Sequence, residues 1–207
     1  MKTKALVMQI TFLLIIFSAY AQKQPSTFAI SAGISSAFYS TDDGGSSYSD
    51  NKAGLSAGAS LRLFTGTHWA VNPGLFYVQK GGVESADGIK ATTSLNYLEI
   101  PVNMFYSKRN RFFFGFGPSF AWGLSGKMKV ENESVKLNFG NDAEDDLKPF
   151  EVGLNLMAGF QFENHLFIDL NINTGMNNLS NDDSFKFSNA YLGIRLGYTF
   201  TKKTKPQ

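Results

Sequence analysis

The chain has 207 residues, a length that suits one domain, and it contains no cysteine, so disulfides and thiolate metal sites are excluded. Its 19 basic and 17 acidic residues nearly balance, which gives no reason to expect nucleic acid as a partner. The 20 phenylalanines, 8 tyrosines and 20 glycines, with only 6 prolines, are typical of a sheet protein with tight turns.

The N-terminal segment has the order of a secretory signal peptide. Lys2 and Lys4 form a basic start, residues 5–17 are almost wholly apolar, and Ala19-Tyr20-Ala21 is a small-x-small cleavage site before Gln22. The alternative is an N-terminal membrane anchor, but the apolar stretch is shorter than the ~20 residues that a spanning helix needs. We therefore predict three segments: a signal peptide at 1–21, a barrel domain at 22–200 and a short basic C-terminal tail at 201–207.

The rest of the chain alternates apolar residues with small or polar ones, with a period of two. In one segment Phe112, Phe114 and Phe116 are followed by Phe120, Trp122 and Leu124, while glycine, serine and alanine occupy most positions between them. Eight such segments cover 27–38, 55–63, 69–80, 97–106, 112–124, 150–162, 166–173 and 191–200. A membrane-spanning β-strand needs only ~9–11 residues of this kind, with apolar side chains facing lipid.

A soluble β-sandwich or a lipocalin-like barrel also alternates, but two features favour a membrane barrel. The polar face consists of Gly, Ser and Asn with isolated charges, and short connections alternate with long polar ones. The short connections are 65–68, 107–111 and 163–165, and the long ones are 40–52, 81–90, 125–148 and 178–186. We therefore predict an all-β fold, a closed antiparallel up-and-down transmembrane β-barrel of about eight strands. Its location is the outer membrane of a Gram-negative bacterium, with both termini periplasmic.

The fourth segment carries a resemblance to a known family. Tyr97-Leu98-Glu99-Ile100-Pro101-Val102-Asn103 is similar to the Tyr-Leu-Glu-Ile-Pro segment of the PorT-like outer-membrane β-barrel family of Bacteroidota. The segments 115–118, 153–162 and 191–200 are also similar to strands of that family. The resemblance implies a small porin-like barrel, in a family that includes secretion-apparatus components. Phe200 resembles the terminal aromatic residue that the barrel-assembly machinery reads.

Isolated polar residues on the lumen-facing side of the strands are the candidate site. This barrel-interior cluster comprises Arg62, Lys80, Tyr97, Glu99, Glu151, Asp169 and Arg195. Because a charge inside a narrow barrel must be paired, we expect a polar plug in which the three carboxylates meet Arg62 and Arg195. The structural interpretation is a packing and register device, and the functional alternative is a gate or a proton path.

The sequence gives little support for catalysis or metal binding. The two histidines, His68 and His165, fall at short turns of non-adjacent hairpins, so lipid hydrolysis or acyl transfer lacks a base beside a nucleophile. The third long connection carries the carboxylates Glu131, Glu133, Asp142, Glu144, Asp145 and Asp146. Their spacing is not that of an EF-hand, so we predict a solvated acidic loop, with a hard-cation site as the alternative. We expect no enzyme activity, no cofactor and no metal.

Three classes of function remain open. The first is a structural or interaction barrel with a largely filled lumen and extracellular loops as contact surfaces. The second is a narrow porin-like pore for small solutes, and the third is a lipid-acting enzyme, which the histidine placement disfavours. The expected partners are outer-membrane lipid, the barrel-assembly machinery during insertion and an unidentified protein.

Overall fold

The computed structural model describes residues 26–42, 44–86, 88–108, 111–131, 133–142, 144–182 and 184–201. The predicted signal peptide and residues 202–207 of the predicted tail lie outside these ranges. The strands are β1 (Ser26–Asp42), β2 (Ser46–Tyr48), β3 (Lys52–Phe64), β4 (Trp69–Ala86), β5 (Ile89–Ser107), β6 (Phe112–Val130), β7 (Glu133–Leu137), β8 (Phe150–Gln161), β9 (Leu166–Gly175) and β10 (Lys186–Thr201). Within the described ranges no helix is long and apolar enough to cross a membrane.

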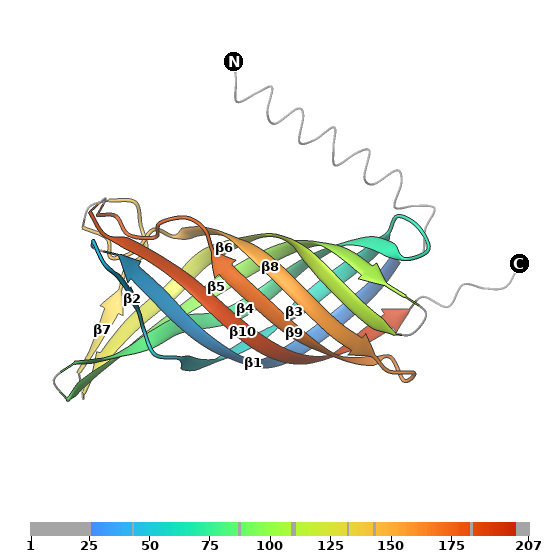
Figure 1. Ribbon diagram of the computed structural model, residues 1–207, viewed down its shortest axis with the longest axis horizontal. Helices are drawn as coiled ribbons and strands as arrows, with labels where there is room; N and C mark the ends of the chain where they lie inside the picture. The colour runs from blue at the N-terminus through green and yellow to red at the C-terminus, as the bar shows by residue number, and fades with distance from the viewer. Residues whose placement is uncertain are drawn as a thin grey trace, which may run out of the picture.

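Eight of the strands form a closed antiparallel ring (Figure 1). Neighbours in the ring follow the chain in the order β1, β3, β4, β5, β6, β8, β9 and β10. The ring closes because β10 pairs with β1 along its whole length, from Thr27 opposite Thr201 to Asp42 opposite Lys186. The predicted fold is thus confirmed. Closure leaves none of these eight strands with a free edge along the wall, which a sheet surrounded by lipid requires.

The short strands β2 and β7 lie outside the ring. Strand β2 pairs only with the end of β1, and β7 pairs only with the end of β6. They belong to hairpins at one end of the barrel, which we call the loop end. The other end, the turn end, carries the short connections 65–68, 108–111 and 162–165 and both ends of the described chain (Figure 1).

The outer wall is apolar and carries aromatic side chains at both ends. At the turn end Trp69 packs on Tyr106, with ring centroids 4.8 Å apart, and nearer the loop end Trp122 packs on Phe150 at 4.6 Å. Leucine, isoleucine and phenylalanine side chains between these girdles remain exposed on the surface of the isolated chain. An apolar band between two aromatic girdles is the arrangement of transmembrane β-barrels.

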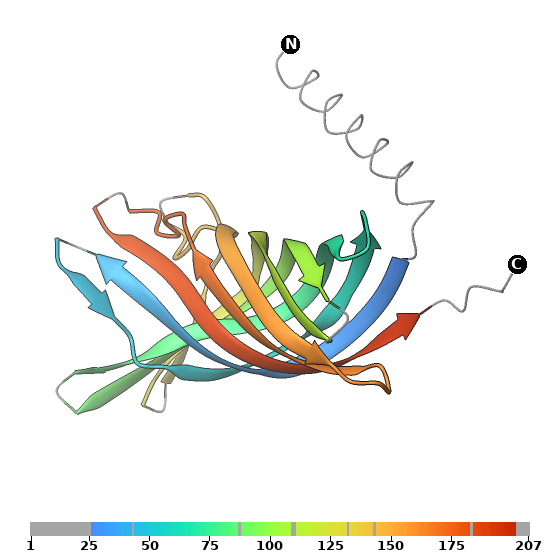
Figure 2. The ribbon, with the colours of Figure 1, turned by 45° about the vertical axis from the view of Figure 1, so that its right-hand side comes forward.

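One predicted loop is not a loop. Residues 81–90 were expected to form a long polar connection, but β4 continues to Ala86 and β5 begins at Ile89. Similarly, parts of 40–52 and 125–148 form the ends of β1 and β6 together with β2 and β7. Figure 2 shows the β4–β5 and β6–β7 hairpins projecting beyond the neighbouring strands. Beyond the membrane both faces of a strand meet water. The strands therefore continue to pair there although they have no apolar face.

Candidate functional site

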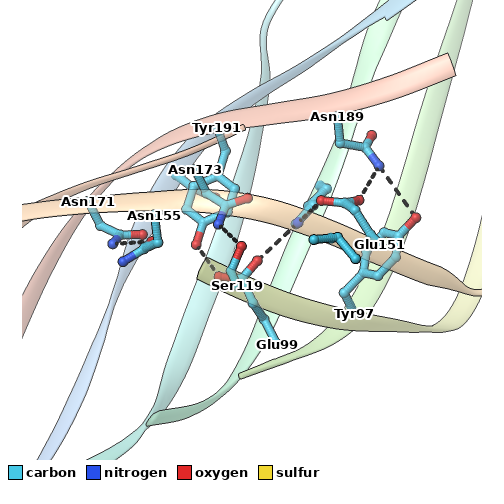
Figure 3. Close-up of polar contacts among 12 residues, drawn as sticks. Tyr97, Glu99, Ser119, Glu151, Asn155, Asn171, Asn173, Asn189 and Tyr191 are labelled. Carbon is cyan, nitrogen blue, oxygen red and sulfur yellow. Dashed lines mark hydrogen bonds and ion pairs between the residues drawn. The ribbon is translucent and has the colours of Figure 1, made fainter. Parts of the chain in front are cut away.

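Lys80 of β4 lies between two carboxylates in a charged layer of the lumen, those of Glu99 and Glu151, which Figure 3 labels. Its Nζ lies 2.6 Å from Oε1 of Glu151 and 3.0 Å from Oε2 of Glu99. The Tyr191 hydroxyl donates to Oε1 of Glu99 at 2.7 Å, and Nδ2 of Asn189 donates to Oε2 of Glu151 at 3.0 Å. All five residues are buried. The layer therefore links β4, β5, β8 and β10 across the barrel.

Two tyrosine rings complete this layer. The Lys80 Nζ lies 5.0 Å from the ring centroid of Tyr97 and 5.4 Å from that of Tyr191. Both distances suit a cation–π contact, which is strongest where water is excluded. Two carboxylates therefore face one ammonium group in this layer.

The pairing differs from the predicted one. Glu99 and Glu151 meet Lys80, not Arg62 or Arg195, because the stagger of the strands brings Lys80 to their height. Asp169 pairs with Arg195 as expected, with Arg195 Nε donating to Oδ1 at 2.9 Å. These two residues are direct neighbours on β9 and β10. The Arg195 guanidinium also lies over the ring of Phe76, 4.6 Å from its centroid.

Arg62 of β3 lies in a separate layer near the turn end and makes no ion pair with any described residue. Its guanidinium lies 4.6–5.3 Å from the centroids of three phenylalanine rings, those of Phe105, Phe113 and Phe167. Its Nη1 donates to Oε1 of Gln161 at 3.1 Å. This cation is therefore held by aromatic faces and one amide, and it plugs the lumen by packing.

A ladder of buried asparagines lies in the lumen, and its residues were not part of the predicted polar cluster. Asn171 donates to Asn155, and Asn155 donates to Asn103, each at 2.9 Å. Asn173 donates to Ser119 at 2.7 Å (Figure 3). These residues all fall on the polar positions of the period-two pattern, which was the available signal.

Glycines on the inner wall make room for aromatic rings. A Cβ atom placed on Gly74 would collide with the ring of Phe76, and one placed on Gly123 would collide with the ring of Phe139. At Gly197 the obstacle would include the ring of Phe167. At these three positions the space beside the glycine is thus occupied by a phenylalanine ring.

Apolar residues from the connections close the loop end of the lumen. Leu137, Leu147 and Leu179 are buried in one cluster with Tyr39, Leu95, Tyr97, Ala121 and Phe187. The connections are also tied together, since the Lys148 amide donates to the Leu179 carbonyl at 2.7 Å. The acidic third connection and the β9–β10 connection therefore cover the charged layer beneath them.

The remaining candidates are not assembled into a site. Within the part of the chain that the structure describes, no three His, Asp or Glu side chains are placed to hold a metal ion. His68 stacks on Tyr106 and His165 lies near Tyr198, both at the turn end. In the β9–β10 connection, hydrogen bonds from Ser184 lower the pKa of the Asp182 carboxyl, which caps a local turn.

The closed ring and the apolar wall with two aromatic girdles define a small outer-membrane β-barrel. Residues 20–181 match the family model described as the outer membrane protein beta-barrel domain, and the chain belongs to this family. A search among curated proteins finds no match.

Solved barrels of similar fold come from several bacteria. The Neisserial surface protein A has a TM-score of 0.59 and 11% identity, covering 84% of this chain and 97% of that one. Ail, the attachment invasion locus protein of Yersinia pestis, has a TM-score of 0.44 and 16% identity, covering 86% and 100%. OprG from Pseudomonas aeruginosa has a TM-score of 0.40 and 14% identity, covering 86% and 97%. At 11% identity the likeness to the Neisserial protein shows the fold and not the role.

Proposed function

We propose that this protein is a non-conducting outer-membrane barrel that serves as a rigid base for protein contacts made at its loop end. The observation that carries the proposal is that buried side chains interact across the lumen in three successive layers. The Arg62 layer lies toward the turn end and the asparagine ladder lies between the two charged layers. The Lys80 layer lies toward the loop end, under an apolar cap formed by Leu137, Leu147 and Leu179. A barrel of eight strands has just enough interior for such a filling.

The proposed orientation places the turn end and both chain termini in the periplasm. Short turns on the periplasmic side and longer connections outside are the usual asymmetry of these barrels. The projecting hairpins β4–β5 and β6–β7 and the cap would then face the exterior, where an unidentified protein partner can reach them. The similarity to PorT-like barrels makes a component of a secretion assembly the first kind of partner to test.

The other parts of the proposal follow from the same chain. A cleaved signal peptide at 1–21 exports the protein, and the barrel-assembly machinery inserts it, with exposed Phe200 at the end of β10 as the recognised aromatic residue. The protein needs no cofactor and catalyses no reaction. Nucleic acid is not a partner.

Single-channel conductance tests the proposal against its alternative, a narrow pore for small solutes. The mature protein is refolded, its folding is established by heat-modifiable gel mobility, and it is inserted into planar bilayers beside a known porin. We expect no openings from the folded barrel, because buried side chains cross the lumen in the Arg62 layer, the asparagine ladder and the Lys80 layer. Stable, reproducible openings would favour the pore, and Glu99→Gln would then show whether the charged layer gates it.

A further inference from the structure

The outer wall of β4, β5 and β6 changes from apolar to polar along one line of side chains near the loop end. The Tyr77 hydroxyl donates to Oδ1 of Asn96 at 2.8 Å, and Asn96 Nδ2 donates to the Ser125 hydroxyl at 2.9 Å. Toward the turn end, the next outward side chains include exposed Leu75 and Trp122. Amides and hydroxyls avoid hydrocarbon, so this line lies at the level where lipid headgroups begin.

Three lysines lie just beyond this line on the same outer face. Lys127 follows Ser125 by two positions on β6, and Lys129 follows Lys127 by two, so all three side chains point outward. Lys136 of β7 is directly opposite Lys127 in the ladder and shares its face. The three lysines are exposed, and none of them makes an ion pair with a described residue.

Placing Lys127 opposite Lys136 has a cost, because like charges directly across a ladder repel. An anion between the ammonium groups would remove this repulsion. The outer surface formed by Lys127, Lys129 and Lys136, here called the lysine face, continues into the lipid-facing wall at Trp122. The nearest anions in the membrane are therefore the phosphate groups of lipids.

We propose that Lys127, Lys129 and Lys136 bind the phosphate groups of anionic lipids in the leaflet at the loop end. With the orientation proposed above, this is the outer leaflet. The lysines would hold the β6–β7 hairpin down on the membrane surface and fix the height of the barrel. A lysine near an anionic surface strengthens binding about fivefold, so the three together give a substantial preference for anionic lipid.

The chain provides its own reporter for a test. Trp122 lies in the girdle beneath the lysines, and the other tryptophan, Trp69, lies in the girdle at the turn end. In a Trp69→Phe background, Trp122 fluorescence reports the lipids around the lysine face. The protein is folded into phosphatidylcholine vesicles that contain either brominated phosphatidylglycerol or brominated phosphatidylcholine, and quenching by the two brominated lipids is compared.

We expect brominated phosphatidylglycerol to quench Trp122 several-fold more effectively at low salt, and high salt to reduce the difference. Replacing Lys127, Lys129 and Lys136 by Gln should abolish the preference. The matched control replaces Lys108, Arg111 and Lys186 by Gln, which removes the same charge from strand ends away from Trp122 and should leave the preference intact.

Equal quenching by both lipids in the parent protein would overturn the proposal and leave the lysine face open to a protein partner instead. A preference that survives in the lysine variant, or that the control loses equally, would also overturn it. If the triple variant fails to show heat-modifiable mobility, the single variants Lys127→Gln and Lys136→Gln are measured, and each should lose part of the preference. The conductance experiment is independent of this result.

Discussion

The two halves of the lumen are filled by different interactions. Near the loop end, Lys80 is held by two carboxylates, Glu99 and Glu151, in a hydrogen-bonded layer. Near the turn end, Arg62 is held by three phenylalanine rings and one amide. The first layer depends on charge compensation, so losing its cation leaves two carboxylates without a cation. The second depends on ring contacts and one hydrogen bond, so losing its cation leaves no carboxylate without its ion-pair partner. The variants below test this difference between the two layers.

Lys80→Met is the variant with the largest expected effect. It keeps much of the side-chain volume but leaves Glu99 and Glu151 buried side by side without a cation. Removing one partner of a buried ion pair typically costs about 3–5 kcal/mol. Urea unfolding of the barrel in vesicles, followed by tryptophan fluorescence, measures the loss. The triple variant Lys80→Met, Glu99→Gln, Glu151→Gln should recover most of it, and no recovery would show that packing, not charge, dominates this layer.

Tyr191→Phe should have the second-largest effect. The Tyr191 hydroxyl is buried and donates to the Glu99 carboxylate at 2.7 Å. Because a hydrogen bond to a charged group contributes about 1.5–3 kcal/mol, the free energy of unfolding should fall by that amount. The matched control is Tyr198→Phe on the outer wall of the same strand, which should change stability little. Equal losses for both tyrosines would contradict the assigned role of the hydroxyl.

The sequence predicted the wall better than the filling. Period-two alternation is imposed by lipid on one side and lumen on the other, so it placed Glu99, Glu151 and Arg195 on the inner face. Pairing depends also on the stagger between strands that are not neighbours in the chain, which alternation does not contain, and Arg62 was therefore assigned the wrong partners. The ends of β4 and β5 within residues 81–90 were predicted as a loop. They extend beyond the membrane, where no lipid imposes the alternation of apolar and polar residues.

Arg62→Met should cost less than either change above. It removes the cation from the rings of Phe105, Phe113 and Phe167 but retains an unbranched apolar side chain among them. A desolvated cation–π contact contributes about 2 kcal/mol to stability. The variant no longer buries a charged guanidinium, and the desolvation cost that it avoids offsets part of this loss. Urea unfolding should thus show a loss of at most about 2 kcal/mol. A loss larger than that of Lys80→Met would reverse the comparison between the two halves.

Glu151→Gln should have the smallest effect, although Glu151 makes the shortest contact with Lys80. The change leaves one carboxylate, Glu99, facing one ammonium group, so the charges of the layer balance, and the amide oxygen can still accept from Lys80. Losing the charged hydrogen bond to Lys80 destabilises the barrel, whereas removing the excess negative charge of the layer stabilises it. Because the two effects oppose each other, the free energy of unfolding should change by less than about 1 kcal/mol. In a Lys80→Met background the same change should instead stabilise the barrel, since it removes one of two uncompensated anions. A double-mutant cycle measures this change of sign, and additivity of the two substitutions would mean that Lys80 and Glu151 do not interact.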